Sequence, residues 1–159
     1  MEGRLLLDTN VLLDYADPDR SGHAAAFELV NAAYENGVEL LVTPCSLKDV
    51  YYVSIAAEKR RMRAAGAEPT ESDCAAINEY AFSLVEMLAE NMAVLADAPN
   101  DPRMAVKLQG VHPDFEDNLL VAAAMNLQGC TLVTSDRQLI LHAPVSALAP
   151  ADALALYGR

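Results

Sequence analysis

The stretch RLLLDTN, residues 4–10, places a carboxylate directly at the end of a short apolar run. Its leucines are contiguous rather than alternating with polar residues, which is typical of a strand buried on both faces of a parallel sheet. The runs VELLVT at residues 38–43 and TLVT at residues 131–134 have the same character. Segments with helical periodicity separate these runs, and strands that alternate with helices predict an α/β fold.

We expect a three-layer α/β/α sandwich with a central, mainly parallel sheet of four to five strands. The apolar runs at residues 93–96 and 145–148 are the candidates for its remaining strands. Residues 9–18 are rich in turn-forming residues and are expected to form turns. Caps and periodicity predict helices at residues 21–36, 44–65, 70–91 (with Thr70 and Asp73 as a capping box), 103–109, 114–128 and after Pro150.

The composition is that of a globular protein. A chain of 159 residues, of which 53% are hydrophobic, is long enough to bury a core and is not globally disordered. No apolar run approaches the ~20 residues of a membrane span. The first residues also lack the apolar segment of a signal peptide. We therefore expect a cytoplasmic protein without a membrane partner.

The cysteines and histidines lack the spacing of metal ligands. Cys45, Cys74 and Cys130 form no CxxC pair, so neither a disulfide framework nor a thiolate zinc site is expected. The histidines are scattered along the chain, and we expect all of them to lie outside the functional site: His23, His112 and His142.

The formal net charge of −12 argues against a nucleic-acid partner, because phosphate binding usually requires a basic face. This argument from net charge is weaker if some of the acidic residues hold a metal ion, since the bound cation reverses the local potential. One basic cluster could be either a nucleic-acid patch or the solvated end of a helix: Lys59, Arg60, Arg61 and Arg63. The sequence leaves both interpretations open.

Acidic residues recur where an α/β fold would bring them together. Asp8 and Asp136 each follow an apolar run, whereas Asp49 and Asp117 each lie near the start of an apolar helix. The carboxyl ends of parallel strands meet at one edge of the sheet, which is where ligands bind in this architecture. Because like charges in one crevice repel unless a cation neutralises them, we expect these carboxylates to form a divalent metal site.

Polar neighbours of these acids are candidates for supporting roles. Asp114 lies three residues before Asp117 and shares its helical face, while Glu116 is expected to point elsewhere. Hydrogen bonds that orient a carboxylate or a water molecule could come from Asn10, Thr134 and Ser135. All of these residues also have a structural alternative, since Asp, Asn, Ser and Thr commonly cap helices and turns.

The residues around these acids limit the classes of reaction that the site could catalyse. The chain has no glycine-rich phosphate loop and no recognisable Ser-His-Asp or Cys-His arrangement. Ligand sets made only of oxygen favour Mg²⁺ or Mn²⁺ over zinc. Such ions hydrolyse phosphodiesters by activating a water molecule and stabilising the leaving oxygen. The residues therefore favour a metal-dependent phosphodiesterase, most plausibly a nuclease.

The pieces LLLDTNVLLD, CSLKDVYYV, DFEDNLLVAAA and LVTSDRQL, in this order, resemble the successive motifs of the PIN domain. That family includes the toxin ribonucleases of bacterial VapBC-type toxin–antitoxin pairs. The resemblance implies an α/β/α sandwich and an endoribonuclease that depends on Mg²⁺ or Mn²⁺ and cuts single-stranded or structured RNA. It also implies a cognate antitoxin and a homodimer, with residues 1–159 forming a single PIN-like nuclease domain.

By position, Asp8, Asp117 and Asp136 match the metal-binding aspartates of the PIN family. Asp49 lies where the family most often has Glu, and its shorter side chain favours action through a water molecule. Asp114 matches an acid that only some members have. The resemblance thus implies Asp8, Asp49, Asp117 and Asp136 as the catalytic set, with Asp114 as a further metal ligand.

Two alternatives remain open. A PIN-like fold that no longer cuts could serve as an RNA-binding or protein-interaction module, although all of the acidic positions are present. A phosphatase of the haloacid dehalogenase kind also has a first strand that ends in Asp. That class normally has a second Asp where this chain has Asn10, and no lysine partner is evident.

Overall fold

The structure of this chain is a computed structural model that describes residues 3–158. Its strands form one sheet in which every neighbouring pair is parallel, in the order β3-β2-β1-β4-β5. The strands are β1 (Arg4–Leu7), β2 (Glu39–Val42), β3 (Ala93–Val94), β4 (Cys130–Val133) and β5 (Ala147–Leu148). The expected parallel α/β architecture is confirmed, with β1 at the centre of the sheet.

Helices follow each strand. The connections between strands contain α1 (Thr9–Ala16), α2 (His23–Glu35), α3 (Pro44–Ala64), α4 (Glu71–Asn91), α5 (Asp101–Lys107), α6 (Phe115–Met125) and α7 (Arg137–His142), and α8 (Pro150–Tyr157) follows β5. None of the helices in residues 3–158 is long and apolar enough to cross a membrane.

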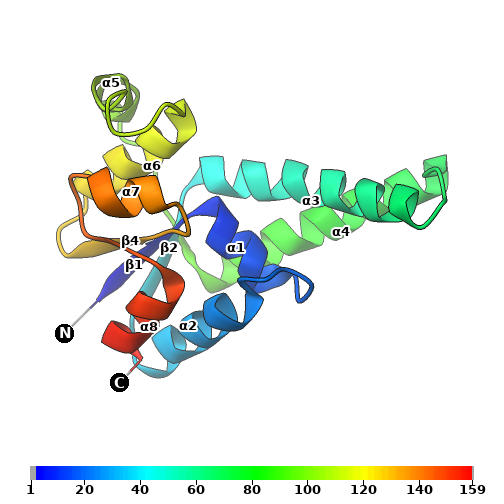
Figure 1. The fold of residues 1–159 in the computed structure, drawn as a ribbon, viewed down its shortest axis with the longest axis horizontal. Helices are drawn as coiled ribbons and strands as arrows, with labels where there is room; N and C mark the ends of the chain where they lie inside the picture. Colours follow the sequence, from blue (N-terminus) through cyan, green and yellow to red (C-terminus); the bar gives the residue numbers. More distant parts are fainter. Residues whose placement is uncertain (1–2, 159) are drawn as a thin grey trace.

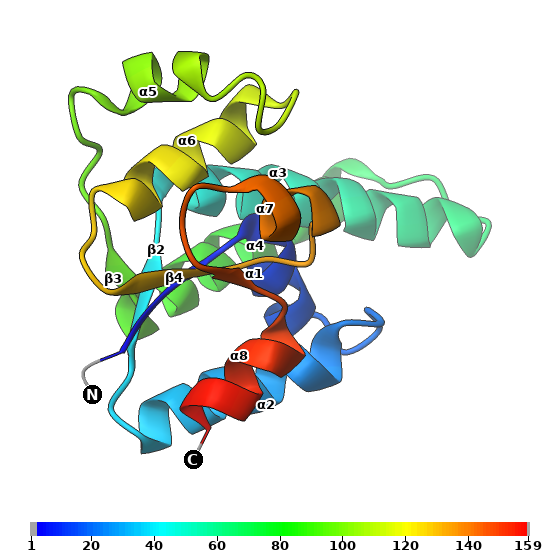
Figure 2. The same ribbon diagram turned by 60° about the vertical axis from the view of Figure 1, so that its left-hand side comes forward.

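Successive leucines of the central strand point alternately to the two helical layers. Leu5 and Leu7 pack in the core beneath α1, α2, α3, α4 and α8, whereas Leu6 packs in the core beneath α6 and α7. All three side chains are fully buried. Figures 1 and 2 show these layers on opposite faces of the sheet, with α3 and α4 extending together as a long hairpin. The contiguous leucines therefore build a three-layer sandwich.

Local sequence signals explain several helix boundaries. The hydroxyl of Thr43 accepts a hydrogen bond from the backbone N–H of Ser46 at 3.0 Å, and Pro44 occupies the first turn of α3. The expected capping box at the start of α4 is confirmed, since Thr70 and Asp73 exchange both of its hydrogen bonds. At the end of α3, Gly66 adopts a φ of 85°, which favours glycine.

The expectation that residues 9–18 form turns is wrong over most of that range. Thr9–Ala16 is the helix α1, because Val11 and Leu12 are fully buried against the sheet and their packing outweighs the turn preference of Asn10. Asp14 is buried in this helix, but its charge is paired with Arg20. Burial and a compensating cation thus override local propensity here.

Other boundaries shift by a few residues. The helix expected from residue 21 begins at His23, the last strand covers only Ala147–Leu148, and the helix expected over residues 114–128 spans Phe115–Met125. These are the end positions at which fraying and local hydrogen bonds compete with regular structure.

The strand order places a crevice beside the central strand. From β1 the chain proceeds to β2 and β3 toward one edge, then returns to β4 on the other side of β1. The connections that leave β1 and β4 therefore diverge. In parallel sheets this reversal of strand order leaves an opening at the carboxyl ends of the two strands, where ligands bind. Asp8 and Asp136 follow these two strands.

Candidate metal centre

Asp8 and Asp136 are connected through one hydroxyl at the ends of β1 and β4. Thr134 Oγ1 donates a hydrogen bond to Asp8 Oδ2 at 2.7 Å and accepts one from the backbone N–H of Asp136 at 3.0 Å. Asp8 is 4% exposed and Thr134 is fully buried. Burial raises the pKa of the Asp8 carboxyl, and the Thr134 hydrogen bond opposes that rise. Asp8 is therefore a buried acid held by a neutral donor.

Asp117 brings a second carboxylate to this place from the first turn of α6. Its pKa is raised to about 6, first because of burial and then because of the charge of Asp8, while His112 opposes the rise. Asp114 is the N-cap of the same helix, and its Oδ1 accepts from the backbone N–H groups of Glu116 at 2.7 Å and Asp117 at 3.4 Å. Asp114 therefore has the capping function that the sequence left open.

His112 contradicts the expectation that every histidine lies outside the site. Its Nδ1 is 2.8 Å from Asp117 Oδ2, and its Nε2 is 3.2 Å from Asp136 Oδ2. Ligand atoms of these three residues lie within 4.8 Å of one another, which is a spacing that could hold a metal ion. The loop before α6 folds back onto the carboxyl end of β4, and sequence spacing could not indicate this contact.

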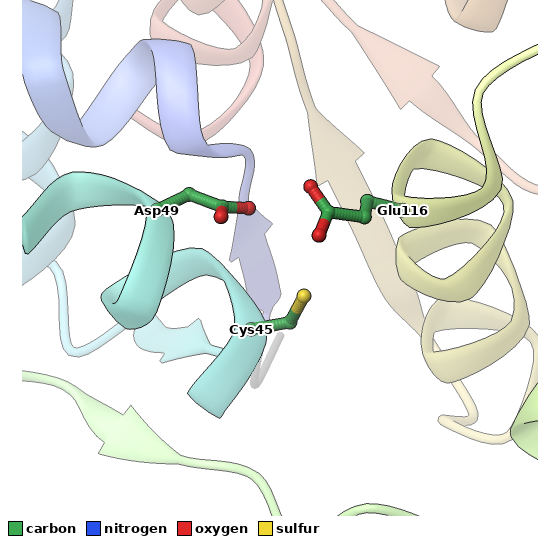
Figure 3. Close-up of side chains that lie close together, drawn as sticks. All are labelled: Cys45, Asp49 and Glu116. Carbon is green, nitrogen blue, oxygen red and sulfur yellow. The ribbon is translucent and has the colours of Figure 1, made fainter. Parts of the chain in front are cut away.

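A second acidic cluster lies between α3 and α6. Ligand atoms of Cys45, Asp49 and Glu116 lie within 4.8 Å of one another. Figure 3 shows the carboxylates of Asp49 and Glu116 pointing toward each other, with the Cys45 thiol directed into the same gap. Lys48 Nζ bridges the two carboxylates, at 3.1 Å from Asp49 and 2.6 Å from Glu116. Glu116 therefore points away from the cluster of Asp117, as expected, but it joins a second cluster with Asp49 that the sequence did not indicate.

Burial and charge both act on this second cluster. Burial raises the pKa of Asp49; Lys48 opposes that rise and Glu116 adds to it. Burial and the charge of Asp49 raise the pKa of the Cys45 thiol. Glu116 reaches Asp49 because it lies in the first turn of α6, on the side that faces α3. Because its pKa is raised, the Cys45 thiol is protonated at neutral pH and is not a reactive thiolate.

A cavity of about 850 Å³ is lined by Asp117 from the first cluster and by Cys45, Asp49 and Glu116 from the second. Its lining includes the acids Asp8, Asp49, Asp114, Glu116 and Asp117 and the cations Arg20 and Lys48. The volume is in the range of ligand sites, and the opening lies at the carboxyl ends of the strands. The structure thus brings Asp8, Asp49 and Asp117 to one cavity, whereas Asp136 and Thr134 support it from the β4 side.

Arg20 is a cation of this cavity that the sequence did not single out. Its Nε donates to Asp14 Oδ1 at 2.6 Å, and the Asp14 carboxylate is buried. A Cβ at Gly22 would come within 2.1 Å of Asp14 Oδ2, so only glycine fits beside this carboxylate. The pair therefore holds the Arg20 side chain at the wall of the cavity by its Nε, leaving the terminal guanidinium nitrogens for another partner.

The remaining candidates lie at the edges of the site. Asn10 is exposed in the first turn of α1 and lines the cavity, and Ser135 is exposed after β4. The basic cluster lies in the last two turns of α3, where Arg61 pairs with Asp17 and Glu58 and Arg63 pairs with Glu68. These ion pairs favour the solvated helix end over a nucleic-acid patch.

Comparisons with known proteins bear on this geometry. A family model described as PIN domain matches residues 4–138. A comparison with curated proteins gave no match. The fold is similar to the structure of VapBC2 from Rickettsia felis bound to a DNA fragment from their promoter, with a TM-score of 0.63 and 11% identity over 92% of this chain and 98% of that chain.

Two further solved structures share the fold. PAE2754 from Pyrobaculum aerophilum has a TM-score of 0.62 and 22% identity, covering 99% of this chain and 96% of that chain. VapBC-1 from nontypeable Haemophilus influenzae has a TM-score of 0.61 and 13% identity, covering 92% of this chain and 98% of that chain. At these identities the likeness concerns the backbone architecture.

Proposed function

Because this chain belongs to the PIN domain family, we propose that it is an endoribonuclease that depends on Mg²⁺ or Mn²⁺ and hydrolyses phosphodiester bonds of RNA. The observation that carries the proposal is the pair Asp8 and Asp117. Asp8 is buried beside a neutral hydroxyl, and the pKa of Asp117 is raised to about 6, first by burial and then by the charge of Asp8. Two carboxylates in this state attract a divalent cation.

The donor set fits a hard cation. Asp8 and Asp117 would hold the ion, with Asp114 in the lining of the same cavity and ligand atoms of Asp136 within 4.8 Å of those of Asp117. Carboxylate oxygens are the ligands that Mg²⁺ and Mn²⁺ prefer. A bound divalent ion supplies the positive charge that activates a water molecule and stabilises the leaving oxygen of a phosphodiester.

Residues across the cavity act on the substrate. Asp49 has a raised pKa, which suits a carboxylate that accepts the proton of the attacking water molecule. Arg20 presents its guanidinium to the cavity and is suited to grip a phosphate oxygen of the RNA. Asn10 lines the same cavity and is suited to orient water, and Ser135 is an exposed hydroxyl after β4 that could do the same. Local cations of this kind allow an RNA substrate despite the net charge of −12.

We also propose that the protein is the toxin of a toxin–antitoxin pair that acts in the cytoplasm, with a cognate antitoxin as partner and a homodimer as its working form. The support is the similarity of fold to structures of VapBC proteins over at least 92% of the chain. Growth arrest on expression, relieved by co-expression of a small protein encoded next to this gene, is the expected behaviour. Growth that continues during expression of soluble, folded protein contradicts the toxin role.

Cleavage of a mixed RNA pool by the purified protein tests the nuclease. Cleavage is expected with Mg²⁺ or Mn²⁺ and not with EDTA, and Asp8→Asn and Asp117→Asn should each lower it at least ~100-fold. Glu79→Gln, on the exposed surface of α4, is the matched control that removes a carboxylate elsewhere. Full activity in both site variants contradicts the proposed mechanism.

A further inference from the structure

Lys48 lies between the carboxylates of the second acidic cluster. Its Nζ donates to Glu116 Oε1 at 2.6 Å and lies 3.1 Å from Asp49 Oδ1. Lys48 and Asp49 belong to α3, whereas Glu116 belongs to α6, so the contact joins two helices through residues 68 positions apart in the chain. Lys48 lines the same cavity as Asp8 and Asp117. The cavity that contains the proposed metal ligands therefore also has a fixed positive charge in its wall.

The first turn of α6 divides its acids between the two clusters. Glu116 and Asp117 are consecutive, so their side chains leave the helix about 100° apart. Asp117 is grouped with His112 and Asp136, with ligand atoms within 4.8 Å of one another. Glu116 is grouped in the same way with Asp49, and their carboxylates point toward each other (Figure 3). The carboxylates available to a second metal ion are thus those of Asp49 and Glu116.

Lys48 competes with a divalent ion for these two carboxylates. Its ammonium is tethered one residue before Asp49 and so has a high effective concentration there, whereas a free ion must bind from solution. A divalent ion between the carboxylates would also be repelled by this like charge. Cys45, the remaining member of the cluster, offers a protonated thiol, and hard cations prefer oxygen ligands. The cluster therefore favours its own lysine over a metal ion.

We propose that Lys48 occupies the position of a second metal ion, so that the centre binds one divalent ion per chain and the ammonium supplies the second positive charge to the RNA phosphate. The inference rests on the proposed nuclease function and adds the number of ions and the residue that replaces one of them. In two-metal centres the ions stabilise the attacking and the leaving oxygen. An ammonium has three N–H donors, so a lysine that donates to Glu116 and pairs with Asp49 keeps a donor for a phosphate oxygen.

Counting bound Mn²⁺ by electron paramagnetic resonance tests the number of ions. The wild-type protein is expected to bind one Mn²⁺ per chain at ~0.1–1 mM free Mn²⁺, the range of weak oxygen-ligand sites. Lys48→Gln should bind a second ion in this range, because Asp49 and Glu116 lose their cation. The second ion should be absent from Lys48→Arg, which keeps the charge, and from Lys48→Gln combined with Glu116→Gln. Lys107→Gln, at the exposed end of α5, is the matched control and should bind one ion.

The number of bound ions separates this inference from the proposed function. Two ions in the wild type overturn the inference and leave the metal dependence intact, whereas no bound ion contradicts the proposed metal-dependent function itself. A single ion in both the wild type and Lys48→Gln also overturns the inference, and so does a second ion that persists after Glu116→Gln. The wild-type measurement requires no variant, and circular dichroism verifies the folding of each variant.

The Mn²⁺ dependence of RNA cleavage gives the second readout. At the Mn²⁺ concentration that saturates the wild type, Lys48→Gln should cleave ~100-fold more slowly, because one positive charge on the phosphate is missing. A higher Mn²⁺ concentration should restore most of this loss in Lys48→Gln and none of it in the double variant. A loss caused only by the missing ion pair between α3 and α6 would not respond to metal. Unchanged cleavage by Lys48→Gln, or a loss that Mn²⁺ does not restore, overturns the role of Lys48 as the second cation.

Discussion

Thr134 Oγ1 lies 2.7 Å from Asp8 Oδ2, and this hydrogen bond joins the ends of two parallel strands that are 126 residues apart in the chain. The same oxygen accepts the backbone N–H of Asp136 at 3.0 Å. One buried hydroxyl thus sets the position of both strand-end acids at the point where the strand order reverses. A neutral donor positions Asp8 without neutralising it, so the charge remains available to a cation.

Thr134→Val is expected to weaken both folding and metal binding. The valine has the same shape but leaves Asp8 without its side-chain donor and the Asp136 N–H without its acceptor, which costs about 1–3 kcal/mol of unfolding free energy. Urea denaturation and Mn²⁺ titration measure the two effects. The control Thr131→Val removes a buried hydroxyl that bonds Ser146 and Tyr157, so it should reduce stability without changing Mn²⁺ affinity. Equal Mn²⁺ affinity in all three proteins contradicts the positioning role of Thr134.

Asp117 predicts an unusual pH dependence of stability. Its pKa is raised from 3.8 to about 6 in the folded protein, so the folded state binds a proton more tightly than the unfolded chain does. Without metal, this group therefore stabilises the fold fully below pH ~4, and its contribution is lost as the pH rises through ~6. The urea concentration at the midpoint of unfolding should therefore decrease as the pH rises from 4 to 7, and it should decrease less steeply in Asp117→Asn. An identical pH profile in the variant contradicts the assignment.

The same carboxylate predicts a trade-off between stability and metal binding. At pH 7 without metal, Asp117→Asn removes the repulsion with Asp8 and is expected to raise the melting temperature by ~2–4 °C, as a gain of about 1 kcal/mol does in a domain of this size. Added Mn²⁺ should raise the melting temperature of the wild type and leave that of the variant almost unchanged. Differential scanning calorimetry with and without EDTA measures both.

Arg20→Lys should separate substrate contact from folding. Lysine can still pair with the buried Asp14, so the unfolding free energy is expected to change by less than ~1 kcal/mol, but the planar guanidinium is lost. RNA cleavage should fall ~10-fold, mainly through a higher KM. Arg103→Lys on the exposed side of α5 is the matched control. Wild-type kinetics in Arg20→Lys count against a phosphate contact by this residue.

Cys45 offers a chemical test of the cavity. Burial and Asp49 raise the pKa of its thiol, so a maleimide is expected to react slowly at pH 7 and faster as the pH rises toward 9. A bulky adduct at this wall of the 850 Å³ cavity should abolish RNA cleavage. Cys45→Ser is expected to remain active after the same treatment. Mass spectrometry locates the adduct, and full activity of a Cys45-modified protein contradicts the assignment of the cavity as the RNA site.

Much of this architecture was predictable from local sequence. Contiguous leucines at 5–7 predicted a strand buried on both faces, and Thr70 with Asp73 predicted the start of a helix. These signals are local: side-chain periodicity and cap hydrogen bonds act within a few residues. The placement of Asp8 and Asp136 at strand ends followed from the same local signals, since a carboxylate directly after an apolar strand lies at the carboxyl edge of the sheet.

The tertiary structure alone decided which side chains meet. The sequence by itself determined the strands, most of the helices and the acids at their ends, because propensity and patterning operate over short distances. Packing placed His112 between Asp117 and Asp136, turned Glu116 toward Asp49, and made α1 a helix around a buried Asp14. These outcomes depend on contacts between residues distant in the chain and on compensation of buried charge, as with Arg20 beside Asp14. No local pattern encodes such contacts.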